Sequence, residues 1–319
     1  RQLLENLSQL REQGLAIVLI THRIPETMSV ADRVTVLRRG RVVLHDKREN
    51  LTEARLAQAI VGEYETFETT KNNLPGEALV QLGHVCSDPG TRGVALQDIS
   101  LDLRSGEIVG VAGVSGNGQQ ELVDALIGIL PMTGGTYCVA GRDLTNATTN
   151  QIRQSDVKIA CILQDRRTQG LLLSFSVTDN LFLGRTAPNE RWGIISQRER
   201  QKQAWELVRR FEIAAPSPET PAAALSGGHQ QRVIAARELS GDPCFIIAHD
   251  PTRGLDVRAT SRVRNLLLEA CDRGAAILLI SSDLDEIMTV ADRIAVLYEG
   301  GIRAILPAES ATSEKLGKA

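Results

Sequence analysis

The sequence predicts an α/β fold with a mainly parallel sheet. Short apolar runs at 245–248 and 276–280 are rich in β-branched residues and have the length of buried strands. A segment with helical character, 261–271, separates them, and alternation of strands with helices favours parallel pairing. A third apolar run, 107–112, enters a glycine-rich turn and then a helix expected at 120–127. Ligands of such sheets bind at the carboxyl ends of the strands, so the loops there form the candidate site.

The beginning of the chain repeats its end. Residues 14–22, Gly-Leu-Ala-Ile-Val-Leu-Ile-Thr-His, align with residues 274–282, Gly-Ala-Ala-Ile-Leu-Leu-Ile-Ser-Ser. Residues 28–37 align with 288–297 at the same separation, and both segments contain Val-Ala-Asp-Arg. A repeat of such long period indicates duplication of a whole domain rather than a solenoid.

The repeat divides the chain into three parts. We expect the tail of a first domain copy at 1–62 and a complete second copy at 78–319. The intervening residues, 63–77, are polar and include Pro75-Gly76, which is typical of a linker. The chain opens on Arg1 inside an apolar helical pattern without a capping residue, so we expect a piece of a longer protein.

Three other segments have a recognisable pattern. Residues 85–103 alternate and turn as antiparallel strands do. The charged stretch near 187–224 predicts helices. The run 16–20 is short and β-branched, so we expect a buried strand there.

Composition narrows the class of protein. The 319 residues are 42% hydrophobic and 24% charged with a net charge of -3, which describes a globular chain with a substantial core. This balance disfavours nucleic acid as a partner, because phosphate binding usually requires a basic surface. No apolar run reaches the roughly 20 residues of a membrane-spanning helix. The five cysteines form no Cys-x-x-Cys pair, which predicts reduced, buried thiols.

The glycine-rich turn, Gly-Val-Ser-Gly-Asn-Gly-Gln-Gln, is a candidate phosphate site. Between a strand and a helix, its backbone N–H groups could wrap phosphates. The P-loop pattern requires Lys and then Ser or Thr, but Gln119 and Gln120 stand there. A dinucleotide fingerprint fits less well because its third glycine would fall on Glu121, and a tight turn without a ligand is the other alternative. The candidate nucleotide-binding residues are Gly113, Gly116, Asn117, Gly118, Gln119 and Gln120.

A second pattern, Leu-Ser-Gly-Gly-His-Gln-Gln-Arg at 225–232, stands at the start of a predicted helix. A Ser hydroxyl and glycine N–H groups at a helix N-terminus form an anion site. The segment resembles the signature motif of ATP-binding cassette (ABC) proteins, and an inert helix cap is the alternative. Its candidate residues are Leu225, Ser226, Gly227, Gly228, His229 and Gln230.

Residues 244–256 resemble the Walker B strand and D-loop of the same family. Where the family has a Mg²⁺-binding carboxylate and then a catalytic Glu, this chain has His249 and Asp250. Asp can accept a proton, but its carboxylate reaches one methylene less far than that of Glu. We expect His249 to be an exposed residue at the strand end, with no metal ligand retained. Asp256 matches the D-loop Asp.

Two more family positions differ between the copies. The switch histidine that follows the last core strand is kept in the first copy as His22, whereas the second copy has Ser281-Ser282. The aromatic residue that stacks on adenine has no counterpart, since residues 78–112 contain no Phe, Tyr or Trp. Gln164 matches the Q-loop of the family.

The resemblance covers essentially the whole chain. It implies an ABC ATPase core (a RecA-like P-loop NTPase) with an antiparallel β subdomain and a helical signature subdomain, preceded by the tail of a homologous domain. A site without Lys and the Mg²⁺ carboxylate is not expected to hydrolyse ATP. In this family each ATP lies between one domain's P-loop and the other's signature. The resemblance therefore implies a site for ATP and Mg²⁺ made of a first-copy P-loop, His22 and residues 226–228.

Within the family, tandem domains with a degenerate second P-loop resemble the ATPase subunits of bacterial simple-sugar importers. Residues 164–181 resemble that group's Glu-Asp-Arg segment, although Gln164 replaces the Glu, and residues 116–122 and 248–257 resemble its nucleoside branch. This implies transmembrane permease subunits as partners at the cytoplasmic face of the plasma membrane. A periplasmic or lipoprotein solute-binding protein would act indirectly.

The alternative functions are a soluble twin-cassette protein and a regulatory half without catalysis. A soluble twin-cassette protein acting on ribosomes usually has a long charged linker and intact motifs in both copies, which this chain lacks. A regulatory half without catalysis is compatible with the transport function, and we expect the isolated chain to be inactive or nearly so. Weak nucleotide binding by the remaining glycine N–H groups stays open.

Overall fold

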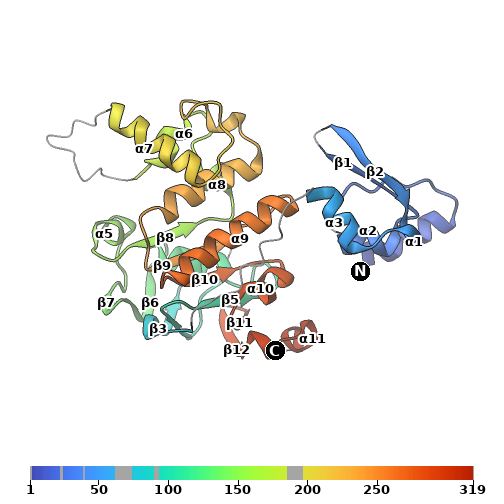
Figure 1. Cartoon of the computed structure of the whole chain (residues 1–319). Coiled ribbons are helices and arrows are strands. Elements are labelled where there is room, and N and C mark those ends of the chain that lie inside the picture. The colour runs from blue at the N-terminus through green and yellow to red at the C-terminus, as the bar shows by residue number, and fades with distance from the viewer. Residues whose placement is uncertain are drawn as a thin grey trace. The chain divides into compact units, whose positions relative to one another are not determined.

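The strands predicted at 107–112, 245–248 and 276–280 lie side by side in one sheet (Figure 1). The computed structural model describes residues 2–21, 24–38, 40–61, 74–89, 93–184 and 197–318. The chain divides into two compact units. One comprises Arg1–Glu68 with Leu255–Ser261, and the other comprises Thr69–Gly254 with Arg262–Ala319.

The main sheet has the order β12-β11-β5-β10-β9-β8, and all neighbours run parallel except β11 and β12. Its strands are β5 (Ile108–Ala112), β8 (Ile159–Ile162), β9 (Phe245–His249), β10 (Ala276–Ile280), β11 (Arg293–Tyr298) and β12 (Gly301–Pro307). Alternate residues of β9 enter opposite hydrophobic clusters, with Phe245 and Ile247 in one and Ile246 and Ala248 in the other. Both faces are covered, which explains why the strand is continuously apolar.

A second, antiparallel sheet has the order β4-β3-β6-β7 and confirms the antiparallel strands expected at 85–103. Its strands are β3 (Ala78–Ser87), β4 (Ile99–Arg104), β6 (Met132–Val139) and β7 (Arg142–Asp143). Val80, Leu103 and Tyr137 share one buried cluster with Val109 of β5 and Leu122 of the helix after β5. The antiparallel sheet therefore helps to hold that helix and the turn before it.

The helices after residue 74 are α4 (Gln119–Leu126), α5 (Thr149–Gln154), α6 (Val177–Leu181), α7 (Gln197–Arg210), α8 (Gly227–Leu239), α9 (Val257–Asp272), α10 (Leu284–Val290) and α11 (Ser313–Lys318). The described residues in this range also form a π-helical turn, η2 (Arg166–Gly170), and the 3₁₀ turns η4 (Ala222–Ala224) and η5 (Ala308–Ser310). Helices α6, α7 and α8 pack together (Figure 1). The helical prediction near 187–224 is confirmed for α7, and residues 185–196 lie outside the described part of the chain.

The N-terminal unit is a hairpin flanked by helices. It contains α1 (Gln2–Glu12), α2 (Ile24–Val30), β1 (Arg33–Arg38), β2 (Arg41–Lys47), η1 (Arg48–Asn50) and α3 (Glu53–Val61). The β1–β2 register shifts between Val36 and Leu37, and the β11–β12 register shifts between the aligned residues Val296 and Leu297. The two hairpins therefore share an irregularity at equivalent positions of the repeat.

The strand expected at residues 16–20 is absent from the structure, so that prediction is wrong for this chain. The segment has no regular secondary structure, and Val18 and Ile20 are 88% and 94% exposed. The aligned strand β10 lies between β5 and β9, whereas among the described residues the only pairing in the N-terminal unit is β1 with β2. A strand needs neighbours to satisfy its backbone hydrogen bonds, and this segment has none in the described structure.

Two other expectations concern cysteines and membranes. Within the described structure the five cysteines form no disulfide, but only Cys271 is fully buried and the other four are half-buried, which corrects the expectation of buried thiols. Burial raises the pKa of the Cys161 thiol, so the side chain stays protonated. Within the described ranges, every helix is too short or too polar to cross a lipid bilayer.

Candidate functional site

Four of the predicted loops meet at one edge of the main sheet. Strands β8, β9, β10 and β5 are parallel and adjacent, so their carboxyl ends lie together. Gln164 follows β8, Asp250 follows β9 and Ser282 follows β10, while the glycine-rich turn follows β5. The structure thus brings together the P-loop, Q-loop, Walker B and switch positions predicted from sequence.

The glycine-rich turn is closed by one of its own side chains. Gln119 is only 8% exposed, and its Oε1 accepts a hydrogen bond from the Asn117 N–H at 3.0 Å. Its Nε2 donates to the Val114 carbonyl at 3.0 Å. A Cβ at Gly113 would lie 2.9 Å from that Nε2, so the Gln119 amide rests on the Gly113 backbone. In a working P-loop such N–H groups face phosphates, but here the Asn117 N–H already has an acceptor.

Neighbouring contacts fix the turn further. Asn117 Oδ1 accepts from the Glu299 N–H at 3.0 Å, and the Asn117 carbonyl accepts from the Gly300 N–H at 2.9 Å. The buried Gln120 donates through Nε2 to Asp124 at 2.8 Å, one helical turn further along α4. Gly116 and Gly118 have φ values of +94° and +108°, which glycine adopts without steric cost. The side chains at the Lys and Ser/Thr positions therefore serve the protein's own structure.

The Asp250 carboxylate accepts three hydrogen bonds from two other loops. The residue is 6% exposed, and its Oδ2 accepts from Gln164 Nε2 at 2.7 Å. Its Oδ1 accepts from the Ser282 N–H at 2.7 Å and from the Ser282 hydroxyl at 3.0 Å. The carboxylate thus joins the Q-loop, Walker B and switch positions through hydrogen bonds.

His249 is buried, at 4% exposure, so the expectation of an exposed strand-end residue is wrong. It pairs with Ile280 at the end of β9, a strand covered by β10 and β8, and this central place explains the burial. Among the described residues, no three His, Cys, Asp or Glu side chains gather to hold a metal ion.

These residues do not fit Mg²⁺-ATP. The Asn117 N–H is bound to Gln119, the Asp250 carboxylate is bound to Gln164 and Ser282, and Gln120 donates to Asp124. The phosphate-binding cation and the metal carboxylate are also missing from the motif positions.

The signature loop has the opposite character. Ser226 is the N-cap of α8, its hydroxyl makes no capping hydrogen bond, and the residue is exposed. Behind it, Leu225 is buried, and Gln230 Nε2 donates to the Ala222 carbonyl at 3.1 Å. His229 Nδ1 accepts from the Ala214 N–H at 3.0 Å, and Gly228 is half-buried. The loop is therefore anchored from behind and presents its hydroxyl and helix N-terminus outward.

Asp256 and His22 complete the predicted set. The Asp256 Oδ1 accepts from the Ala259 N–H at 2.8 Å and caps the first turn of α9. His22 lies outside the described residues, so its role stays a prediction.

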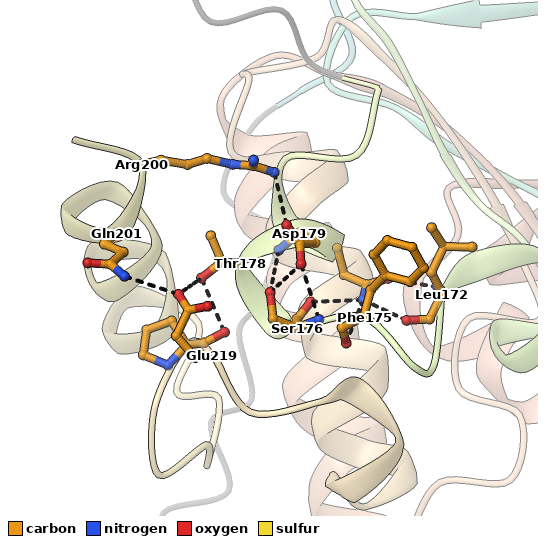
Figure 2. Close-up of polar contacts among 10 residues, drawn as sticks. Leu172, Phe175, Ser176, Thr178, Asp179, Arg200, Gln201 and Glu219 are labelled. Atoms are coloured by element: carbon orange, nitrogen blue, oxygen red, sulfur yellow. Dashed lines mark hydrogen bonds and ion pairs between the residues drawn. The ribbon is translucent and has the colours of Figure 1, made fainter. Parts of the chain in front are cut away.

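The segment that follows the Q-loop ends in a tightly bonded helix start (Figure 2). Ser176 and Asp179 form a capping box at α6, and Arg200 of α7 lies 3.5 Å from Asp179. Beside this frame Leu172 and Phe175 are 42% and 50% exposed. A firm polar frame thus holds apolar side chains at the surface, which is suited to a protein contact.

The fold and the site resemble those of known proteins. The sequence profile of the ABC transporter family matches residues 96–253. The chain carries an ABC transporter domain. The guanosine import ATP-binding protein NupO of Bacillus subtilis is 39% identical, and the nucleoside import ATP-binding protein NupA of Lactococcus lactis is 36% identical. Each alignment covers 99% of this chain and 62% or 63% of the relative, so the chain spans about three fifths of their length.

Other relatives and structures agree with this assignment. A ribose import ATP-binding protein RbsA of Rhizobium johnstonii is 35% identical over 98% of this chain and 61% of its own length. Among solved structures, the ADP- and Pi-bound dimer of the ATP-binding cassette MJ0796 aligns with a TM-score of 0.61 at 24% identity. It covers 72% of this chain and 99% of that one, and at this identity it shows the fold alone. The ABC transporter domain thus has the α/β cassette fold predicted from sequence.

Sequence reasoning missed two features of the site. It counted Ser282 only as a lost histidine, although its N–H and hydroxyl both hold Asp250. It included Arg166 in the Glu-Asp-Arg segment but missed the contacts of this residue with the signature and D-loop backbones. No local pattern announces either contact, because each joins residues far apart in the sequence.

Proposed function

We propose that this chain is part of a tandem-domain transport ATPase subunit whose second domain lends its signature loop to the ATP site of the first. The contrast at Ser226 carries the proposal. Its exposed hydroxyl and helix N-terminus suit a phosphate, whereas Gln119 and Asp250 are bound within the second domain's own site. The catalytic ATP, with Mg²⁺, would then lie on a first-domain P-loop, with His22 contributing from residues 1–62.

The domain division follows from the same proposal. Residues 1–62 are the tail of the first ABC domain, 63–77 the linker and 78–319 the second domain. The shared hairpin irregularity and the unit boundary between Glu68 and Thr69 support it.

The transported solute would be a sugar or a nucleoside, as the names of the relatives suggest. Permease subunits in the plasma membrane would bind the cytoplasmic ATPase, and a periplasmic or lipoprotein solute-binding protein would deliver the solute. The exposed Leu172 and Phe175 beside the Q-loop segment support a permease contact there.

The test uses the full-length subunit with its permease. A Ser226→Arg variant should lose ATP turnover by about 100-fold or more, because it fills the anion site with a large side chain. Ser115→Arg makes the same change at an exposed residue of the glycine-rich turn and should leave turnover within about twofold of wild type. The reverse pattern would refute the proposal.

The isolated 319-residue chain gives a second test. We expect no steady ATP turnover, since Gln119 replaces the phosphate-binding Lys. Turnover by the purified chain that disappears with Ser226→Arg would contradict this expectation.

A further inference from the structure

Arg166 lies where three functional segments meet. It opens η2, two residues after Gln164, and its Nη1 donates to the Arg253 carbonyl at 2.9 Å. A Cβ at Gly254 would lie 3.8 Å from the same Nη1, so the guanidinium runs alongside the backbone that leads to the D-loop Asp256. One side chain thus links the Q-loop segment to the D-loop.

The same guanidinium lies across the signature motif. A Cβ at Gly227 would come within 2.8 Å of Arg166 Nη2 and 3.3 Å of its Cζ. A side chain at Gly227 would therefore require the flexible end of the Arg166 side chain to shift. In this chain the glycine and the arginine are therefore complementary.

The far end of η2 is fixed to the same helix. Arg237 of α8 donates through Nη1 to the Gly170 carbonyl at 2.8 Å. A Cβ at Gly170 would lie 2.6 Å from Ile234 Cδ1, which shows how closely the turn packs on α8. The turn η2 therefore contacts α8 near both of the turn's ends, through Arg166 at Gly227 and through Gly170 at Arg237.

Helix stability does not explain the position of Arg166. A cation beside a helix N-terminus meets the positive end of the helix dipole, which is the unfavourable arrangement. Its Nε is buried and has no hydrogen-bond partner among the described residues. A buried donor left unsatisfied has a free-energy cost, so the contacts with the Gly227 and Arg253 backbones are the ones that account for this placement.

We infer that Arg166 is a positioning residue that couples the permease-facing segment to the signature and D-loop. The inference rests on the proposed function, since it requires the signature to complete the ATP site of the first domain. A push by the permease on the segment after Gln164 moves η2, and Arg166 transfers that motion to the backbones of Gly227 and Arg253. The second domain thus transmits movement without a nucleotide of its own.

The test measures ATP turnover by the full-length subunit with and without its permease. Arg166→Ala should lower permease-stimulated kcat by about tenfold or more while KM for ATP changes less than about threefold, since a misplaced group slows the reaction more than it weakens binding. Basal turnover without permease should fall much less. Arg166→Lys should restore thermal stability but not stimulation, because a single ammonium cannot cover both backbones.

Arg273→Ala is the matched control, since Arg273 forms an exposed ion pair with Asp242 far along the chain from the site. It should leave the ratio of stimulated to basal turnover unchanged. The inference would be overturned if the ratio of stimulated to basal turnover stayed within twofold of wild type in both Arg166 variants. It would also be overturned if Arg166→Ala lowered the Tm and both turnover rates in parallel and Arg166→Lys restored all three. If Ser226→Arg keeps its turnover, the proposed function itself fails. If Ser226→Arg is inactive but the ratio is unchanged in the Arg166 variants, only the coupling inference fails.

Discussion

The glycine-rich turn and the signature loop both precede a helix, but they use their polar groups in opposite ways. In the turn, the Gln119 amide binds the Asn117 N–H and the Val114 carbonyl. In the signature loop, Ser226 makes no capping bond and faces outward. A backbone shape that could hold phosphate is therefore not sufficient to make a binding site. The N–H and hydroxyl groups must also be free of partners within the protein.

The largest expected effect on ATP turnover comes from substituting a glycine in the signature loop, compared with a glycine in the glycine-rich turn. Gly227→Val in the full-length subunit should reduce ATP turnover by about 100-fold, because the side chain displaces Arg166 and blocks the signature. Gly116→Ala has open space around its Cβ but a φ of +94°, so it should strain the turn by about 1–2 kcal/mol and leave turnover nearly unchanged. Steady-state ATPase assays compare them. Equal losses in both variants would remove the distinction between the loops.

A smaller effect is expected from Asp250→Ala. The substitution removes the acceptor of the hydrogen bonds from Gln164 Nε2 and from the Ser282 N–H and hydroxyl, and should lower the free energy of unfolding by about 3 kcal/mol. The proposed function places catalysis at the ATP site of the first domain. ATP turnover per folded Asp250→Ala molecule should therefore stay within about tenfold of wild type, a much smaller loss than removal of a catalytic carboxylate causes. Urea denaturation and ATPase assays of the full-length protein measure the two quantities. Complete inactivity of the folded variant would make Asp250 catalytic.

A smaller loss of stability is expected from Gln119→Ala in the glycine-rich turn. It frees the Asn117 N–H and removes the bond to Val114, at a cost of about 1–2 kcal/mol in unfolding free energy. The released N–H groups should also give the turn a measurable affinity for inorganic phosphate, detectable by titration. Gln201→Ala is a control, because that exposed side chain makes one long hydrogen bond, to Glu219, within the described part of the chain. Unchanged stability in Gln119→Ala would show that the amide does not close the turn.

The smallest effect concerns the cap of η2. Hydrogen bonds from Thr168 and Arg167 hold the pKa of the Asp165 carboxyl below its usual 3.8. A lowered pKa in the folded state means that the contribution is present above pH 4 and is lost as the pH falls through the folded value. Asp165→Ala should therefore cost about 0.5–1 kcal/mol at pH 7 and less near pH 3. Denaturation at both pH values checks this. A larger cost at low pH would contradict the assignment.

Local pattern was sufficient for much of the fold. The β-branched runs at 245–248 and 276–280 became β9 and β10 because strands covered on both faces need continuous apolar sequence. The glycine-rich turn and signature also fell at helix starts as predicted. Residues 16–20 have the same kind of sequence but no neighbouring strands in the described structure, so the pattern alone misled.

The site was less predictable because its contacts cross the chain. Burial of His249 depends on the order of strands in the sheet, which a single strand's sequence does not contain. The hydrogen bonds from Gln164 and Ser282 to Asp250 join segments that meet only after folding. Sequence could identify which residues had been lost from the family motif, but not what the replacements do.

The closed turn has a thermodynamic consequence. A domain that must bind nucleotide to order its P-loop gains stability with the logarithm of nucleotide concentration, by mass action. In this domain the Gln119 amide replaces the nucleotide as the hydrogen-bonding partner of the turn. Because the amide belongs to the same chain, the turn is ordered without bound ligand. The glycine-rich turn should therefore keep its conformation at any concentration of ATP. If the proposed function holds, the response of the full-length subunit to ATP concentration would come from the ATP site proposed for the first domain.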